Sequence, residues 1–179
     1  MLINVSGSSG VGKTTISTII SLILTNLKNS VLHLCGDDLH KWERGNDNWR
    51  VVTHLNPEAN NLSLGEQQVT SLLSGVAIKR DHYDHNTGKF IKAVKVSPKE
   101  IIINEGLHSL HSENICKKAE LNIFVETEDE LKYQWKLNRD TEKRGYTKSQ
   151  VIKAINLRKE DEIKYIIPQK ENANVIVKF

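Results

Sequence analysis

A segment near the start of the chain combines glycines, hydroxyls and one lysine at a spacing that can hold phosphate groups. The full pattern G-x-x-x-x-G-K-[ST] is matched by Gly7-Ser8-Ser9-Gly10-Val11-Gly12-Lys13-Thr14. Glycines let the backbone turn tightly, so that successive N–H groups point at phosphate oxygens. We expect Lys13 to reach the β- and γ-phosphates, Thr14 to contact Mg²⁺ and Thr15 to donate to the α-phosphate. The pattern predicts a P-loop that binds ATP and Mg²⁺.

Two acidic residues follow apolar runs that read as strands. Asp37 comes after Val31–Cys35, and Glu105 comes after Ile101–Ile103. In α/β sheets, ligands bind beyond the carboxyl ends of the strands, so both side chains are expected beside the phosphates. We expect Asp37, rather than its neighbour Asp38, to accept the proton of an acceptor hydroxyl, and Glu105 to hold Mg²⁺ through water. The alternative for each is a solvated loop carboxylate or a helix cap.

A later basic segment can supply cations for the transferred phosphoryl group. Arg139 and Arg144 lie five positions apart, just before Gly145. Positive side chains there would stabilise charge that develops during phosphoryl transfer. The competing interpretation is a charged surface helix with an ordinary ion pair between Asp140 and Arg144.

The elements that must position these residues alternate between strand and helix, which favours an α/β fold. The apolar patterns predict strands at Leu2–Ser6, Val31–Cys35, Ile101–Ile103, Leu121–Val125 and Val175–Val177. They predict helices at Thr14–Leu27, Leu64–Leu73, Glu128–Lys143 and Lys148–Lys164, and a β-hairpin within Ala77–Val96 around Asn86-Thr87-Gly88. The expected architecture is a three-layer P-loop fold, with a parallel sheet, helices on both faces, a hairpin excursion (76–97) and a helical lid (137–147) in one domain, 1–179.

The bulk properties exclude several classes of protein. With 179 residues, 25 Lys+Arg, 22 Asp+Glu and a formal charge of +3, the chain suits one domain and carries no strong excess charge for nucleic acid. Its apolar runs are shorter than the ~20 residues that cross a bilayer, and its first residues do not resemble a signal peptide. Two cysteines, Cys35 and Cys116, do not indicate a disulfide framework, and a cytoplasmic setting is expected.

Together these segments resemble the phosphoribulokinase/uridine kinase family, and more closely its phosphoribulokinase branch. The matching segments, in family order, are Gly7–Thr14; Gly36-Asp37-x-x-His40 with Arg44; Thr53-His54-x-x-Pro57-Glu58-Ala59-Asn60; Tyr83-Asp84-His85-x-Thr87-Gly88; Glu105-Gly106-Leu107-His108; Trp135-Lys136-x-x-Arg139-Asp140 with Arg144-Gly145; and Pro168-Gln169-Lys170 with Ala173. The chain departs from the family at Asn60–Ser63, in Phe90–Ala93 and at Asn104, and it lacks the carboxyl-terminal extension of that branch.

The resemblance implies a role for each matching position. Asp37 would be the catalytic base, assisted by Lys13, and Glu105 the second acid at the metal. His40 and Arg44 would contact the acceptor, while Arg139 and Arg144 would lie on a lid that closes over ATP and excludes water.

The acceptor side is locally rich in hydrogen-bond donors. Six of the seven histidines fall between His40 and His111. The candidate acceptor contacts are Asp37, His40, Arg44, His54, Arg80, Tyr83, His85 and His108. Such donors favour an anionic small-molecule acceptor over a neutral nucleoside. The pairs His82-x-x-His85 and His108-x-x-His111 have the spacing of zinc ligands but lack further convergent ligands, so no structural zinc site is expected.

The function that follows is an ATP-dependent kinase for a hydroxyl of a sugar or sugar-phosphate-like acceptor. Two alternatives stay open: a uridine/cytidine kinase, in which Trp42, Trp49 or Tyr83 stacks on a base, and a nucleotide-binding regulator that transfers nothing. His33 and His111 are expected to be polar loop residues, and a homodimer is left open.

Overall fold

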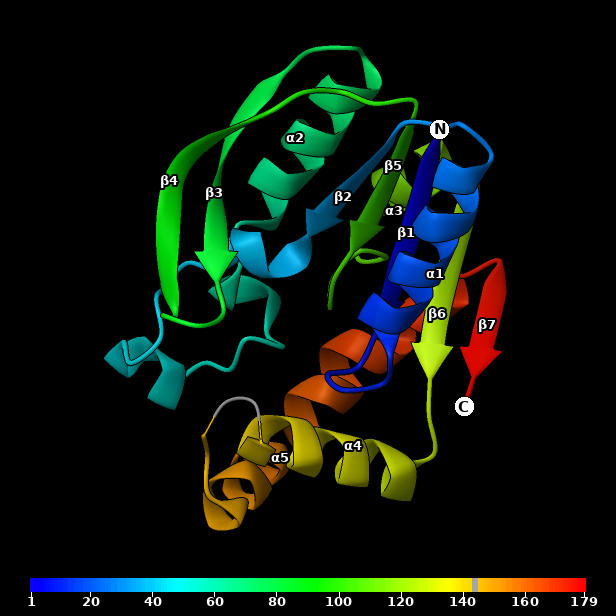
Figure 1. Cartoon of the computed structure of the whole chain (residues 1–179). Coiled ribbons are helices and arrows are strands. Elements are labelled where there is room, and N and C mark those ends of the chain that lie inside the picture. Colours follow the sequence, from blue (N-terminus) through cyan, green and yellow to red (C-terminus); the bar gives the residue numbers. More distant parts are fainter. Residues whose placement is uncertain (143–144) are drawn as a thin grey trace.

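The computed structural model describes residues 1–142 and 145–179 (Figure 1). Its strands are β1 (Leu2–Gly7), β2 (Val31–Cys35), β3 (Ile78–Asp84), β4 (Lys89–Val96), β5 (Ile101–Glu105), β6 (Leu121–Glu126) and β7 (Val175–Lys178). Its α-helices are α1 (Lys13–Asn26), α2 (Leu62–Leu73), α3 (Glu113–Lys118), α4 (Asp129–Glu142) and α5 (Lys148–Asp161).

The main sheet has the strand order β2-β5-β1-β6-β7, and all of its pairings are parallel. Side chains of successive residues in each strand point to opposite faces of the sheet. Ile3 and Val5 of β1 pack in the cluster that α1 covers, whereas Leu2 packs in the cluster that α2 and α3 cover. Helices therefore cover both faces, and the predicted three-layer α/β fold is confirmed (Figure 1).

A ladder of amide side chains crosses the middle of this sheet. Asn104 of β5 donates to Asn4 of β1 at 2.9 Å, and Asn4 donates to Asn122 of β6 at 2.8 Å. Asn4 is fully buried, so each amide needs such a partner. The polar residue Asn104, unexpected in an apolar strand, is thus part of a hydrogen-bonded network of amides.

The predicted hairpin forms a separate two-stranded sheet of β3 and β4. Asp84 stabilises the turn of the hairpin, because its carboxylate accepts hydrogen bonds from the backbone amide of Asn86 and from the Thr87 hydroxyl. Gly88 completes the turn with a φ of +72°. The Tyr83 amide donates to Asp38 at 2.8 Å, which ties the hairpin to the turn after β2.

Two details of the helices differ from prediction. The short helix α3, capped by the Ser112 hydroxyl, was not predicted. Helix α5 ends at Asp161, before the expected Lys164, and continues as a wider turn over Glu162–Ile166 and a 3₁₀ turn over Ile167–Asn172. Pro168 has no N–H to donate, which disfavours a regular α-helix through this segment.

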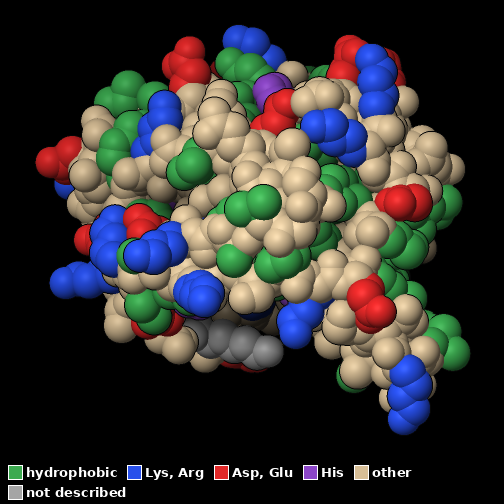
Figure 2. All heavy atoms as spheres, turned by 90° about the horizontal axis from the view of Figure 1, so that it is seen from above, with side chains coloured by type: hydrophobic (Ala, Val, Ile, Leu, Met, Phe, Trp, Pro, Cys, Tyr) green, Lys and Arg blue, Asp and Glu red, His purple; other side chains and the backbone are tan. Residues whose placement is uncertain are grey.

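The carboxyl ends of the parallel strands point toward α4 and α5 (Figure 1). Figure 2 looks onto the opposite end of the molecule, where basic and acidic side chains are interspersed with apolar ones. Among the described residues, no helix has both the length and the apolar character needed to cross a membrane.

Candidate functional site

The P-loop connects β1 to α1 at the carboxyl edge of the sheet. Gly7 has a φ of +144°, and a Cβ there would come 2.2 Å from the Val125 carbonyl oxygen, so only glycine fits. The Lys13 ammonium is buried and donates to the Ser8 carbonyl at 2.9 Å. Burial lowers the pKa of Lys13, while the charges of Glu105 and Asp37 raise it. One ammonium group therefore lies within the fields of both predicted carboxylates.

The two carboxylates are brought together by a close approach of backbones. A Cβ at Gly36 would come 2.9 Å from the Gly106 Cα, and the reverse contact is equally short. The turn that begins at Gly36 after β2 and the turn that begins at Gly106 after β5 therefore lie side by side. Glu105 accepts a hydrogen bond from the Thr14 hydroxyl at 3.1 Å through one oxygen, and its other oxygen lies 3.4 Å from His33 Nε2. Glu105 is the last residue of β5 rather than a loop residue.

Histidines surround Asp37. Its Oδ2 lies 3.2 Å from His85 Nε2, and its Oδ1 lies 3.5 Å from His40 Nε2. Burial alone would raise the pKa of Asp37, but the hydrogen bond from His85 and electrostatic interactions with the neighbouring histidines hold that pKa well below its usual range. Asp37 is therefore ionised at neutral pH and can accept a proton.

Asp38 has a different environment. Its carboxylate lies 3.3 Å from the Arg80 guanidinium and 3.2 Å from His82 Nδ1. It also accepts a hydrogen bond from the backbone amide of Tyr83. Arg80 is itself buried and also donates to the Cys35 carbonyl at 2.8 Å. In this structure Arg80, which was predicted to contact an acceptor, fastens the hairpin to the turn after β2.

The remaining predicted acceptor residues gather around Asp37. His40, His54 and Tyr83 form a cluster of rings, with centroids 5.9 Å apart for His40–His54 and 5.4 Å apart for His40–Tyr83. Arg44 is exposed and donates to the His85 carbonyl at 2.7 Å, so it braces the hairpin. Burial lowers the pKa of His40, and burial together with the charge of Arg158 lowers that of His54 well below its ordinary value.

A cavity of about 360 Å³ opens beside Asp37, between the start of α2 and the loop after β5. Asp37, His40 and His108 lie along its wall. Its further polar lining comes from Asn60, Ser63, Glu66, Asn104, Ser109, His111 and Ser112, and no Lys or Arg is among the described residues that line it. Burial, helped by the charge of His111, lowers the pKa of His108 to about 4. The wall therefore mixes polar groups with apolar side chains, and its described residues include no permanent cation.

The predicted lid contributes cations from α4. Lys136 Nζ lies 3.2 Å from the Ser9 hydroxyl of the P-loop and 3.2 Å from Asp140. Burial, together with the charge of Arg158, lowers the pKa of Lys136 to about 8. Arg139 donates to Asp140 at 2.9 Å, and its charge acts on Lys13. The other predicted lid cation, Arg144, lies outside the described residues.

Three residues at the site were not predicted to act there. Lys136 lies within a matching family segment, which was the only signal for it. Arg158 of α5 faces the site, since its charge lowers the pKa of His40, His54 and Lys136, yet its surroundings read as an ordinary helix surface. His33 was expected in a loop, but it lies in β2 and contacts Glu105.

These residues fit a nucleotide and a divalent cation. The Thr14 hydroxyl and Glu105 carboxylate offer adjacent oxygens, which Mg²⁺ prefers as ligands. Gly10 and Gly12 have φ of +91° and +94°, so the backbone before α1 adopts the left-handed conformation that curls a P-loop. The helix start adds partial positive charge toward an anion.

The chain is similar to known proteins over nearly its whole length. The family model described as Phosphoribulokinase / Uridine kinase family matches residues 2–179. A phosphoribulokinase from Synechocystis sp. is 35% identical over 177 residues, which cover 99% of this chain and 53% of that protein. A uridine kinase from Latilactobacillus sakei is 29% identical over 180 residues, which cover 99% of this chain and 84% of that protein.

Among solved structures, a phosphoribulokinase from Rhodobacter spheroides superposes with a TM-score of 0.80 at 25% identity, covering 99% of this chain and 69% of that one. The chain spans about half the length of the Synechocystis protein and 38% of a chloroplastic phosphoribulokinase from Spinacia oleracea. Since the family model covers all but the first residue, the chain belongs to the phosphoribulokinase/uridine kinase family.

Proposed function

We propose that this chain is an ATP-dependent kinase that transfers the γ-phosphoryl group to a hydroxyl of a sugar or sugar-phosphate-like acceptor. The observation that carries the proposal is the meeting of Asp37, Glu105 and Lys13 at one edge of the sheet. An ionised carboxylate, a second carboxylate beside a hydroxyl, and a buried ammonium are the groups that phosphoryl transfer to an alcohol requires.

In this proposal the P-loop amides and Lys13 hold the β- and γ-phosphates. Thr14 and Glu105 hold Mg²⁺, which neutralises charge on the phosphate oxygens when it is bound. Lys136 and Arg139 approach from α4 and add positive charge over the P-loop. Their position would also exclude water, so that ATP is not hydrolysed in place of transfer.

Asp37 then takes the proton of the acceptor hydroxyl as its oxygen attacks the γ-phosphorus. The low pKa of Asp37 keeps it ionised, and its position between His40 and His85 orients both of its oxygens. The proton moves from the hydroxyl to Asp37, and the bond between the γ-phosphorus and the bridging oxygen breaks, leaving ADP.

Two features bear on the class of acceptor. Cations lie near the groups that surround Asp37: Arg44 donates to the His85 carbonyl, and the charges of Arg158 and Lys136 act on His54. The cavity beside Asp37 has no Lys or Arg among its described lining residues, and it combines hydroxyl, amide and apolar groups with the carboxylate of Glu66. This combination suits a molecule with an anionic end and a hydroxylated body, such as a sugar phosphate. The rings of Trp42, Trp49 and Tyr83 pack edge-to-face against their neighbours, which favours this class over a stacked base.

The direct test measures ADP release with a panel of pentose phosphates, neutral sugars and nucleosides, in the wild type and in Asp37→Asn. We expect turnover with a phosphorylated sugar and a loss of about 10²–10⁴-fold in kcat in the variant, the usual size of a general-base contribution. Asp47→Asn is the matched control, because Asp47 is an exposed carboxylate paired only with exposed Arg50 in the described structure.

The outcomes separate the alternatives. Preferred turnover of uridine or cytidine would support the nucleoside kinase instead. ATP binding without turnover of any acceptor would support the non-catalytic regulator. Arg44→Ala distinguishes the acceptor classes further, since it should raise the KM of an anionic acceptor and leave the KM of ATP nearly unchanged.

A further inference from the structure

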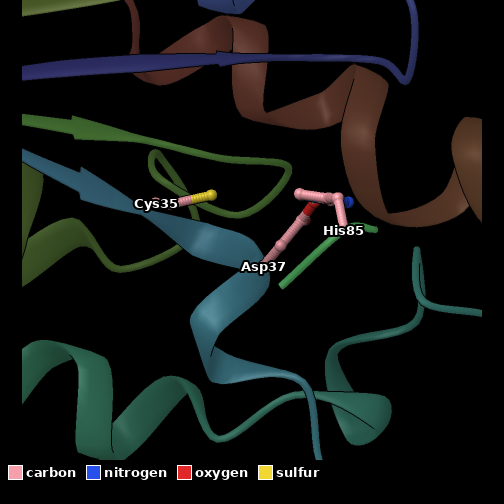
Figure 3. A group of neighbouring side chains, drawn as sticks. All are labelled: Cys35, Asp37 and His85. Carbon is pink, nitrogen blue, oxygen red and sulfur yellow. The ribbon is translucent and has the colours of Figure 1, made fainter. Parts of the chain in front are cut away.

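Three side chains of different chemistry converge at the end of β2. The Cys35 thiol, an Asp37 carboxylate oxygen and a His85 ring nitrogen all lie within 4.8 Å of one another. Figure 3 shows the thiol and the ring directed toward the Asp37 carboxylate. Cys35 is the last residue of β2, Asp37 lies in the turn that follows, and His85 comes from the hairpin after β3.

A further nitrogen is close to this group. His40 Nε2 lies 3.5 Å from Asp37 Oδ1 and forms no hydrogen bond with any residue in the described part of the chain. His85 is exposed and Cys35 is half-buried, so an ion can reach the group from solvent. Among the described residues, this is the one cluster of His, Cys, Asp or Glu with ligand atoms at such spacing.

The ligand types select the ion. One sulfur, one imidazole nitrogen and one carboxylate oxygen match zinc, which takes three protein ligands and leaves a fourth position for water. Mg²⁺ requires oxygen ligands in near-octahedral geometry, so the cofactor of phosphoryl transfer would not compete well here. On binding, the Cys35 thiol releases its proton to water and its sulfur bonds the ion, with no change of oxidation state.

We propose that Cys35, Asp37 and His85 form an inhibitory site for a thiophilic divalent cation, with zinc as the best-fitting ion. A bound cation would occupy the oxygen that is needed to accept the hydroxyl proton, and it would clamp the hairpin to the end of β2. The inhibition rests on the proposed function of Asp37 as the base, whereas the binding of the ion does not.

The spacing of possible zinc ligands along the sequence does not reveal this site. The two His-x-x-His pairs have the spacing of zinc ligands, but only His85 belongs to the cluster, and its partners lie about 50 positions earlier in the chain. The site exists because the hairpin returns to the main sheet.

Binding is tested first, without turnover. Cd²⁺ or Co²⁺ added to the full chain should produce the ultraviolet charge-transfer band of a metal-bound thiolate, and Zn²⁺ should remove the Co²⁺ band by displacement. Cys35→Ser should lack the band. Cys116→Ser is the matched control, because Cys116 is the only other cysteine, and it should keep the band. Cys35→Ala and thermal unfolding of each variant check that the fold is retained.

Inhibition is tested second, at a fixed excess of Mg-ATP and with a free-zinc buffer. The zinc concentration that halves turnover should rise at least tenfold in Cys35→Ser and stay unchanged in Cys116→Ser. Equal zinc sensitivity in all three proteins, or no thiolate band in the wild type, would overturn the proposal. A band that requires Cys35 in a protein that turns over no acceptor would support the metal site and reject the proposed kinase.

Discussion

The half-buried His108 at the wall of the cavity, whose ring nitrogens are shielded from solvent, should make this protein sensitive to mild acid. By geometry, neither ring nitrogen of His108 has a hydrogen-bond partner among the described residues, although an interaction with the His54 backbone raises its pKa in part. We propose the change His108→Phe, which keeps a flat ring of similar shape but cannot take up a proton. Because no good hydrogen bond is lost, the variant should be about as stable as the wild type at pH 7.

The loss of stability in acid can be calculated from the difference between the pKa of His108 in the unfolded chain and its pKa in the folded protein. Burial lowers the pKa of His108 from 6.5 to about 4, so the unfolded chain binds a proton first as the pH falls. Unfolding therefore becomes easier between pH 6.5 and pH 4, and this group adds no further loss below that range. At about 1.4 kcal/mol for each pH unit, the full loss is roughly 3 kcal/mol. That is a large share of the ~5–15 kcal/mol that stabilises a typical domain.

The assay is urea unfolding at a series of pH values from 7 to 4, with wild type and variant side by side. The free energy of unfolding of the wild type should fall more steeply than that of His108→Phe, with the two curves diverging by about 3 kcal/mol at pH 4. Equal urea dependence at pH 7 shows that the variant is folded. Parallel curves over the whole range would refute the assignment of His108 as a histidine that the fold keeps neutral.

Three further outcomes follow from the site. Lys13→Ala should abolish turnover while thermal unfolding shows an intact fold, and near-normal turnover would contradict the P-loop assignment. Asp38→Asn should lower stability by about 3–5 kcal/mol in chemical denaturation, because it leaves buried Arg80 without its ionic partner, and an unchanged stability would argue that this pair is solvated. Hydrogen exchange across Asp129–Glu142 should slow when a non-hydrolysable ATP analogue and an acceptor bind, since Lys136 contacts the P-loop; equal exchange in both states would indicate an ordinary surface helix.

Much of the fold and part of the site could be predicted because their signals are local. The P-loop depends on eight adjacent residues, so its glycines and Lys13 are recognisable without any distant contact. Apolar runs mark the buried parallel strands, and ligands gather at the carboxyl ends of such strands in an open α/β sheet. Asp37 and Glu105 could therefore be assigned to one edge before their distance was known.

Other assignments depended on contacts between residues far apart in the chain. Arg80 reads as an accessible cation in a basic hairpin, yet Asp38, 42 positions earlier, pairs with it in the interior. Arg158 lies on a helix with no distinguishing pattern, and only the placement of α5 turns its charge toward His40 and His54. No short-range pattern encodes such pairings.

The sequence by itself therefore determined the phosphate-binding end of this protein, because a P-loop is built from backbone groups and neighbouring side chains. Only the tertiary structure decided which of two adjacent aspartates is bound to a buried arginine and which faces a cavity. It also brought Cys35 and His85 to the same carboxylate. Burial and charge are properties of the assembled neighbourhood, so the protonation of Asp37 and His108 follows from packing rather than from residue type.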